Sequence, residues 1–133
     1  HAGTIKDPEV GSEGKEASFY TAPEAKLGAH TAPLGLRFYT GDQFPASYKN
    51  QLFIAKHGSW NRSTKSGYEV VLARMDSTGT VTNQEIFVTG WLDTESQEAW
   101  GRPVDVQEWK DGSLLISDDV ANCIYRLSYT QKQ

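Results

Sequence analysis

From residue 34 onward, the hydrophobic positions fall in short runs rich in β-branched and aromatic residues, separated by polar or glycine-containing turns. Runs of this kind are typical of β-strands. The Lys-Asp-Gly step at 110–112 is a strong hairpin signal, because Gly accepts the positive φ that tight hairpins need. No window of helical length has apolar residues at i, i+3, i+4 and i+7. The pattern predicts an all-β fold, with strands over 34–39, 51–56, 68–75, 84–88, 104–109, 113–117 and 122–129.

A loose internal repeat relates the two halves of this pattern. The segments of the first copy are 33–36, 51–55 and 70–74, and those of the second are 103–106, 113–117 and 124–127. A repeated four-stranded antiparallel unit is typical of β-propeller blades. The first copy has a fourth strand at 84–88 and the second has only three, and in closed propellers the other end of the chain usually supplies such a missing outer strand. We therefore predict about two four-stranded antiparallel blades, which need further blades to close a ring.

The first 28 residues differ from the rest, because they are rich in Gly, Glu, Lys, Asp and Pro. This composition favours loops. One short β-like stretch, Ala-Ser-Phe-Tyr-Thr, stands at 17–21. The predicted organisation is a mostly loop leader over 1–28 with one possible strand, followed by propeller blades over 29–133.

Composition and charge limit the kinds of molecule that the chain is expected to bind. The 133 residues suffice for one compact domain, and the net charge is −4 with no basic block. Nucleic acid and anionic membranes are therefore not expected partners. The apolar runs are too short to span a bilayer, and residues 1–16 have no apolar signal-peptide region. Cys123 is the only cysteine, so no disulfide forms within the chain, and we expect a buried structural thiol.

Several motifs occur together in the order found in one known family. They cover 29–41 (AHTAPLGLRFYTG), 57–63 (HGSWNRS), 67–71 (GYEVV), 100–106 (WGRPVDV) and 111–119 (DGSLLISDD). These motifs resemble the C-terminal third of sorbosone dehydrogenase-like proteins, relatives of the soluble pyrroloquinoline quinone (PQQ)-dependent glucose dehydrogenases. The resemblance covers nearly the whole chain, and 1–15 is its loosest part.

The resemblance implies part of a six-bladed propeller that binds PQQ and Ca²⁺ on its top face. Such enzymes oxidise the C1 carbon of aldoses or related sugar aldehydes by hydride transfer to PQQ, with a His as general base. In the family that base and the Ca²⁺ ligands lie upstream of the matched region. We therefore expect no catalytic residue and no metal ligand in this chain, and no activity from it in isolation. The resemblance also implies a periplasmic or secreted location.

The candidate cofactor-binding residues are His57, Arg62 and Arg102. PQQ is a planar tricarboxylate, and the rigid guanidinium fork of Arg pairs with carboxylates and stays charged. Both arginines stand where propeller loops reach the central face, and His57 lies in the dense 57–63 motif. The structural alternative is that Arg62 braces adjacent loops by pairing with Asp118 or Asp119.

The candidate substrate-binding residues are His30, Trp60 and Trp100. The two tryptophans flank the same expected face, where they would stack on a ring; inter-blade packing is their more ordinary role. For His30 a structural role is favoured. Two neighbouring carboxylates, Asp118 and Asp119, suggest a cation, but Ca²⁺ needs six or more oxygens, so capping of the next turn is favoured.

Two alternatives to the dehydrogenase interpretation stay open. In the first alternative, the chain is a non-catalytic propeller module that binds carbohydrate or protein, and the arginines do not converge on a pocket. Alternatively, three chains of two blades each would assemble into a complete ring. The expected partners are accordingly a sugar or sugar aldehyde, and either the remaining propeller blades or further copies of the chain.

Overall fold

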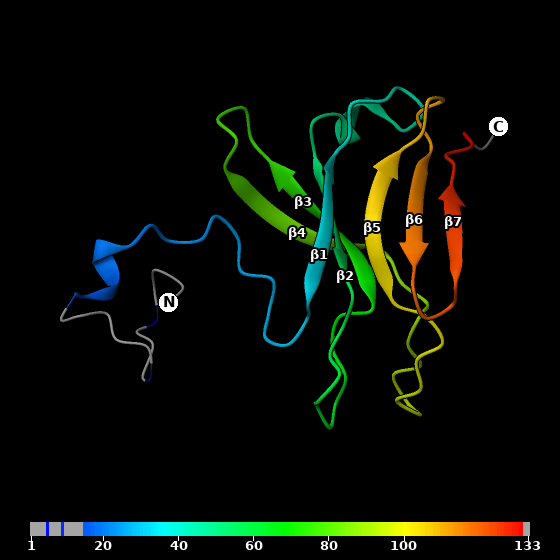
Figure 1. Cartoon of the computed structure of the whole chain (residues 1–133). Helices are drawn as coiled ribbons and strands as arrows, with labels where there is room; N and C mark the ends of the chain where they lie inside the picture. Colours follow the sequence, from blue (N-terminus) through cyan, green and yellow to red (C-terminus); the bar gives the residue numbers. More distant parts are fainter. Residues whose placement is uncertain (1–4, 6–8, 10–14, 132–133) are drawn as a thin grey trace.

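The computed structural model describes residues 5, 9 and 15–131, and it confirms the all-β fold class (Figure 1). Two antiparallel sheets lie side by side, one with strand order β1-β2-β3-β4 and the other with order β5-β6-β7. Two short 3₁₀ helices, η1 and η2, accompany them. The strands are β1 (Pro33–Phe38), β2 (Leu52–Lys56), β3 (Glu69–Met75), β4 (Val81–Val88), β5 (Pro103–Glu108), β6 (Leu114–Asp118) and β7 (Cys123–Leu127), and the helices are Ala17–Phe19 and Ala46–Tyr48.

The internal repeat is visible as an identical pairing register in the two sheets. Leu36 lies opposite Ile54 in the first sheet, as Val106 lies opposite Ile116 in the second. Both sheets also have an irregularity near the start of their first strand. The sheets are therefore two copies of one meander, and the second copy stops after three strands, as the repeat predicted.

The hydrophobic core lies between the two sheets. Successive side chains of a strand point to opposite faces, so Phe53 and Leu72 of the first sheet face Val106 and Ile116 of the second, and all four are buried. The first strands of the two sheets approach closely at Gly35, where a Cβ would lie 2.5 Å from the Cα of Asp105. Gly35 thus allows β1 and β5 to pack almost backbone to backbone.

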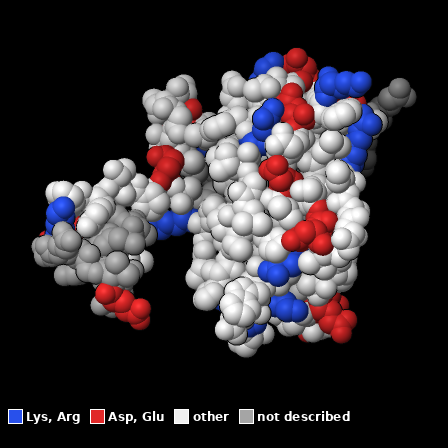
Figure 2. Space-filling view, in the orientation of Figure 1, with Lys and Arg blue, Asp and Glu red and all other residues white. Residues whose placement is uncertain are grey.

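The outer faces of the two sheets differ in character. The first sheet exposes Leu34, Leu36 and Phe38 on β1, together with Ile86 on β4. Figure 2 shows largely uncharged surface over the first sheet, with acidic and basic side chains gathering over β5, β6 and β7. An apolar face of this kind on a sheet is typical of a surface that packs against another element.

Tyr39 joins the two sheets at the end where β1 finishes. Its ring is fully buried, and its hydroxyl donates a hydrogen bond of 2.8 Å to the carbonyl of Gly112 in the β5–β6 turn. The same oxygen accepts hydrogen bonds of 3.0 Å from the backbone N–H groups of Gln43 and Phe44. One side chain therefore fixes a loop of the first sheet against a turn of the second.

The segment before β1 differs from its prediction in one respect. The strand expected over 17–21 is absent, and Ala17–Phe19 forms a 3₁₀ helix with a hydrogen bond from Tyr20 N–H to the Ala17 carbonyl. No strand among the described residues forms a ladder with this stretch, and β propensity alone does not make a strand. Further along, the Glu24 carboxylate accepts a hydrogen bond from Val81 N–H. The predicted leader residues 1–4, 6–8 and 10–14 lie outside the described residues.

Three further expectations need correction. Strand β4 begins at Val81 rather than at 84, and β7 covers Cys123–Leu127 rather than 122–129. Cys123 was expected to be buried and is exposed, because it lies on β7 at the edge of the three-stranded sheet. Within the described residues, no helix is long and apolar enough to span a membrane.

Candidate functional site

The candidate residues gather at the end of the sheets opposite Tyr39. Pro33 at the start of β1 pairs with Lys56 at the end of β2, and Pro103 pairs with Asp118 in the same way. The loops that follow these strand ends therefore lie at the same end of the molecule, at the bottom of Figure 1. The loops are 57–68, 89–102 and 119–122, and the segment 28–32 lies beside them through backbone hydrogen bonds from His57 to Ala32 and from Gly58 to Thr31.

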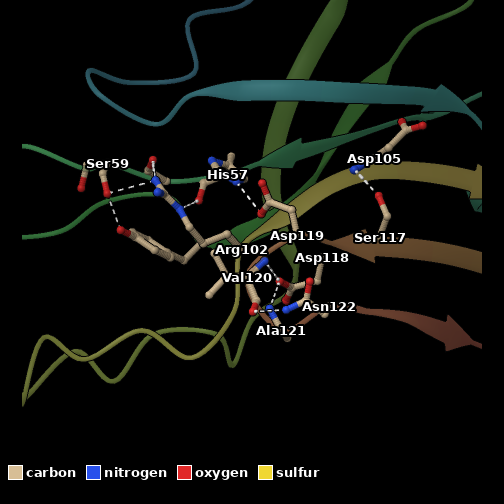
Figure 3. A network of polar contacts seen from close by, with 12 residues as sticks. His57, Ser59, Arg102, Asp105, Ser117, Asp118, Asp119, Val120, Ala121 and Asn122 are labelled. Atoms are coloured by element: carbon tan, nitrogen blue, oxygen red, sulfur yellow. Dashed lines mark hydrogen bonds and ion pairs between the residues drawn. The ribbon is translucent and has the colours of Figure 1, made fainter.

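Arg102 is held by the backbone of the 57–68 loop. Its guanidinium donates hydrogen bonds to the carbonyls of His57 (Nε, 3.0 Å), Gly58 (Nη2) and Ser59 (Nη2, 3.2 Å), as Figure 3 shows. It also lies over the ring of Tyr68, 5.2 Å from the centroid. Arg102 thus lies immediately before β5 of the second sheet and orders a loop of the first sheet, and Nη1 is its remaining donor group.

His57 pairs with a carboxylate of the second sheet. Its Nε2 lies 2.9 Å from Oδ1 of Asp119, and the imidazole side chain is 16% exposed while that of Asp119 is 59% exposed. Figure 3 shows the two side chains pointing toward each other across the junction of the sheets. The hydrogen bond from His57 lowers the pKa of Asp119, and the charges of His57 and Arg102 act in the same direction. This polar pair spans the two sheets at the loop end.

Arg62 does not pair with Asp118 or Asp119, so that alternative is wrong. Its Nη1 instead donates to the carbonyl of Ala29 (3.3 Å) and to Oγ of Ser66 (3.0 Å), while the residue is exposed. Ser66 also donates to Ala29, 3.3 Å away. The Arg62 guanidinium is thus oriented by two contacts, and Nε and Nη2 have no protein partner within the described residues.

The three candidate substrate residues are all exposed. Trp60 is 86% exposed at the 57–68 loop, and Trp100 is 57% exposed before β5. Neither tryptophan is therefore a buried packing residue within the described part of the chain. His30 is exposed and has a φ of 60°, in the left-handed region. Trp100 lines an apolar cavity, and the three candidate cofactor residues are not among the residues that line it.

Asp118 caps the turn that follows β6. Its Oδ1 accepts hydrogen bonds from Val120 N–H (3.0 Å) and Ala121 N–H (2.8 Å), and its Oδ2 accepts one from the hydroxyl of Tyr125 (3.2 Å). The structure thus gives Asp118 the capping role that the sequence favoured. No cluster of three or more His, Cys, Asp or Glu side chains that would hold a metal ion occurs among residues 5, 9 and 15–131.

Sequence reasoning missed the pairing of His57 with Asp119 and the anchoring of Arg102. Because 62 positions separate His57 from Asp119, no local motif signals their contact. The repeat does carry a partial signal, since it aligns the end of 51–55 with the end of 113–117 and so brings the two following loops to one face. The remaining information lies in how the sheets pack.

The chain was compared with known proteins. The TrAA12-like family model matches residues 9–130. An uncharacterised protein of Borreliella burgdorferi is 49% identical over 105 residues, which cover 78% of this chain and 27% of that protein. A PQQ-dependent pyranose dehydrogenase of Coprinopsis cinerea is 42% identical over 50 residues, 38% of this chain and 6% of the enzyme. This chain thus spans only a small part of the relatives that it matches.

Two solved structures share the fold. The holo form of the PQQ domain of pyranose dehydrogenase from Coprinopsis cinerea has a TM-score of 0.58 and 25% identity, over 75% of this chain and 27% of that one. The calcium structure of the Trichoderma reesei carbohydrate-active enzyme of family AA12 has a TM-score of 0.64 and 25% identity, over 77% and 25%. Because the TrAA12-like model covers residues 9–130, the chain belongs to the TrAA12-like family.

Proposed function

We propose that this chain forms part of the cofactor- and substrate-binding face of a PQQ-dependent dehydrogenase that oxidises the C1 carbon of aldoses or related sugar aldehydes. Membership of the TrAA12-like family and the likeness to a PQQ domain of pyranose dehydrogenase support the proposal. The observation that carries it is Arg62, an exposed guanidinium oriented by two hydrogen bonds in the same loop as an exposed Trp60.

Arg62 suits one carboxylate of PQQ. Its Nη1 is fixed by Ala29 and Ser66, so the side chain loses little further freedom when Nη2 and Nε meet an anion. Trp60 offers a flat surface that would stack on a ring. Arg102 suits the cofactor less well, because Nε and Nη2 are occupied by backbone carbonyls. We assign Arg102 to positioning the loop and Arg62 to direct contact.

When bound, PQQ would accept the hydride that leaves C1. In this chain His57, held by Asp119, would hydrogen-bond the quinone or a sugar hydroxyl, while Trp60, Trp100 and His30 would form the substrate rim. The general base and the Ca²⁺ ligands are proposed to lie outside this chain, as is the rest of a six-bladed ring. Isolated chain mixed with PQQ, Ca²⁺, an aldose and a dye acceptor should show no turnover, and turnover would contradict this division of labour.

Calorimetric titration of the 133-residue chain with PQQ in the presence of Ca²⁺ tests the cofactor role. We expect Arg62→Gln to weaken binding about tenfold or more, since charge-assisted hydrogen bonds are the strong ones. Arg37→Gln, a change of the same charge on β1, should leave binding unchanged. Equal affinity of the wild type and Arg62→Gln, or no binding by the wild type, would refute the proposal.

A second function is a non-catalytic carbohydrate-binding module, which the 86% exposure of Trp60 favours. Sugar rings bind to exposed aromatic faces without any cofactor. This alternative predicts that an aldose binds in the absence of PQQ and that Trp60→Ala abolishes the binding. Cofactor-dependent sugar binding would instead favour the dehydrogenase face. The periplasmic or secreted location stays a prediction.

A further inference from the structure

The imidazole of His57 has one nitrogen that is engaged by the protein and one that is not. Nε2 lies 2.9 Å from Oδ1 of Asp119. Nδ1 makes no hydrogen bond with any residue in the described part of the chain, although the side chain is only 16% exposed. Polar atoms that are largely shielded from water usually have a hydrogen-bond partner. Nδ1 therefore marks a position where a ligand would supply the missing partner.

Both members of this pair are carried by backbone that is itself fixed. The N–H of His57 donates to the carbonyl of Ala32 (2.9 Å), and the carbonyl of His57 accepts a hydrogen bond from Nε of Arg102 (3.0 Å). On the other side of the pair, the cap formed by Asp118 holds the turn that carries Asp119. These contacts limit how the imidazole and the carboxylate can turn relative to each other (Figure 3).

The pair determines which nitrogen of His57 carries the proton. A carboxylate only accepts hydrogen bonds, and a neutral imidazole has a single N–H group. Asp119 is held in its carboxylate form, because the hydrogen bond from His57 lowers its pKa. The tautomer of an imidazole is set by the hydrogen bond that one of its nitrogens makes. In the neutral imidazole of His57 the proton therefore lies on Nε2, and Nδ1 has a lone pair without a proton.

This tautomer distinguishes between the two ligands considered for His57. The quinone oxygens of PQQ are hydrogen-bond acceptors, and so is Nδ1, so the two do not form a hydrogen bond with each other. A sugar hydroxyl is a donor and matches the lone pair. A buried acceptor of this kind also favours ligands that have the hydroxyl over analogues that lack it, because the analogue leaves the acceptor without a partner.

We propose that Nδ1 of His57 accepts a hydrogen bond from a hydroxyl group of the sugar, and that Asp119 is the positioning residue that keeps the imidazole proton on Nε2. The proposal rests on the proposed function, because it names which ligand of that site His57 contacts. His57 then contributes to substrate selection, while Arg62 stays the contact to the cofactor.

Nitrogen NMR of the 133-residue chain tests the tautomer. Above the pH at which His57 titrates, its Nδ1 should have a pyridine-type chemical shift and its Nε2 a pyrrole-type shift. Asp119→Asn should give a mixture of the two tautomers, because an amide can donate to Nε2 as well as accept from it. The control is Asp42→Asn, whose carboxylate is 86% exposed at the other end of the sheets, and it should leave both shifts unchanged. If Asp119 had only a structural role, the two variants would give the same His57 shifts.

Titration with glucose and with PQQ tests the ligand. In the wild type, PQQ and Ca²⁺ alone should leave the Nδ1 resonance in place, and added glucose should move it toward the pyrrole-type position. His57→Phe keeps a ring and removes the acceptor. This change should weaken glucose binding about fivefold and alter the PQQ affinity by less than about twofold, since one neutral hydrogen bond is lost.

Three results would overturn the proposal. They are a proton on Nδ1 of the neutral imidazole in the wild type, an Nδ1 resonance that saturating glucose leaves in place with and without PQQ, and a larger effect of His57→Phe on PQQ binding than on glucose binding. The first two need no variant, so they do not depend on how well a variant folds. If glucose moved the Nδ1 resonance while PQQ failed to bind, the proposed function would fail and the contact of His57 with the sugar would stand.

Discussion

Removal of the hydroxyl oxygen of Tyr39 should weaken the connection between the two sheets and so lower the free energy of unfolding. Tyr39→Phe keeps the ring and its edge contacts with Phe44 and Phe53, whose centroids lie 5.3 and 6.2 Å away. It deletes the hydroxyl that donates to the Gly112 carbonyl and accepts from the N–H groups of Gln43 and Phe44. Any loss of stability is therefore due to hydrogen bonding rather than to packing.

The magnitude follows from the groups left without partners. The hydrogen bonds to Gly112 and Phe44 are buried, whereas Gln43 N–H is only partly buried and gains water. An unsatisfied buried group costs about 1–3 kcal/mol, so two such groups suggest a loss of about 3 kcal/mol. For a domain of this size that loss corresponds to a fall in Tm of about 10 °C.

Urea unfolding followed by tryptophan fluorescence measures this loss. The matched control is Tyr48→Phe, whose ring also packs on Phe44 (5.8 Å) but whose hydroxyl makes no hydrogen bond with the described residues. The control should stay within about 0.5 kcal/mol of the wild type. If Tyr39→Phe were as stable as Tyr48→Phe, the hydroxyl would not hold the sheets together and the reasoning would fail.

Two further predictions concern the junction of the sheets. Gly35→Ala should lower the free energy of unfolding in urea by about 2 kcal/mol, because overpacking forces the backbones of β1 and β5 apart. The control Leu34→Ala, at an exposed neighbouring position, should lower it by well under half of that amount. Equal losses for the two variants would contradict the close approach of the strands. The lowered pKa of Asp119 means that its stabilising contact is present above its ordinary pKa and is lost as the pH falls through the folded-state value. Asp119→Asn should therefore flatten the fall in unfolding free energy below about pH 4, and an unchanged pH profile would show that the pair with His57 contributes nothing.

The fold was largely predictable, because hydrophobic periodicity and turn residues are local signals. The Lys-Asp-Gly step and the repeat of 33–36 with 103–106 located the meanders and the missing fourth strand. Local signals failed where tertiary context decides. The stretch at 17–21 has β propensity but forms a 3₁₀ helix over Ala17–Phe19, and Cys123 is exposed because its strand lies at the edge of the described sheet.

The sequence predicts which residues belong to the candidate site better than it predicts the contacts that they make. The sequence predicts Arg62 and Arg102 as equivalent cofactor contacts. In the structure, two nitrogens of Arg102 donate to carbonyls of the 57–68 loop, whereas Nε and Nη2 of Arg62 have no partner among the described residues. That difference depends on which backbone oxygens the folded loop presents, and no pattern of side chains records it. The pairing of His57 with Asp119 depends in the same way on the packing of the two sheets.

Mapping PQQ on the chain by NMR, with Ca²⁺ present, tests the central claim most directly. The account predicts that PQQ shifts the side-chain N–H resonances of Arg62 and the indole resonance of Trp60, with smaller changes at Trp100. No change is expected at Trp109, which directly follows the end of β5. Shifts confined to other surfaces, or no shifts at saturating PQQ, would contradict the assignment of the 57–68 loop to a cofactor face.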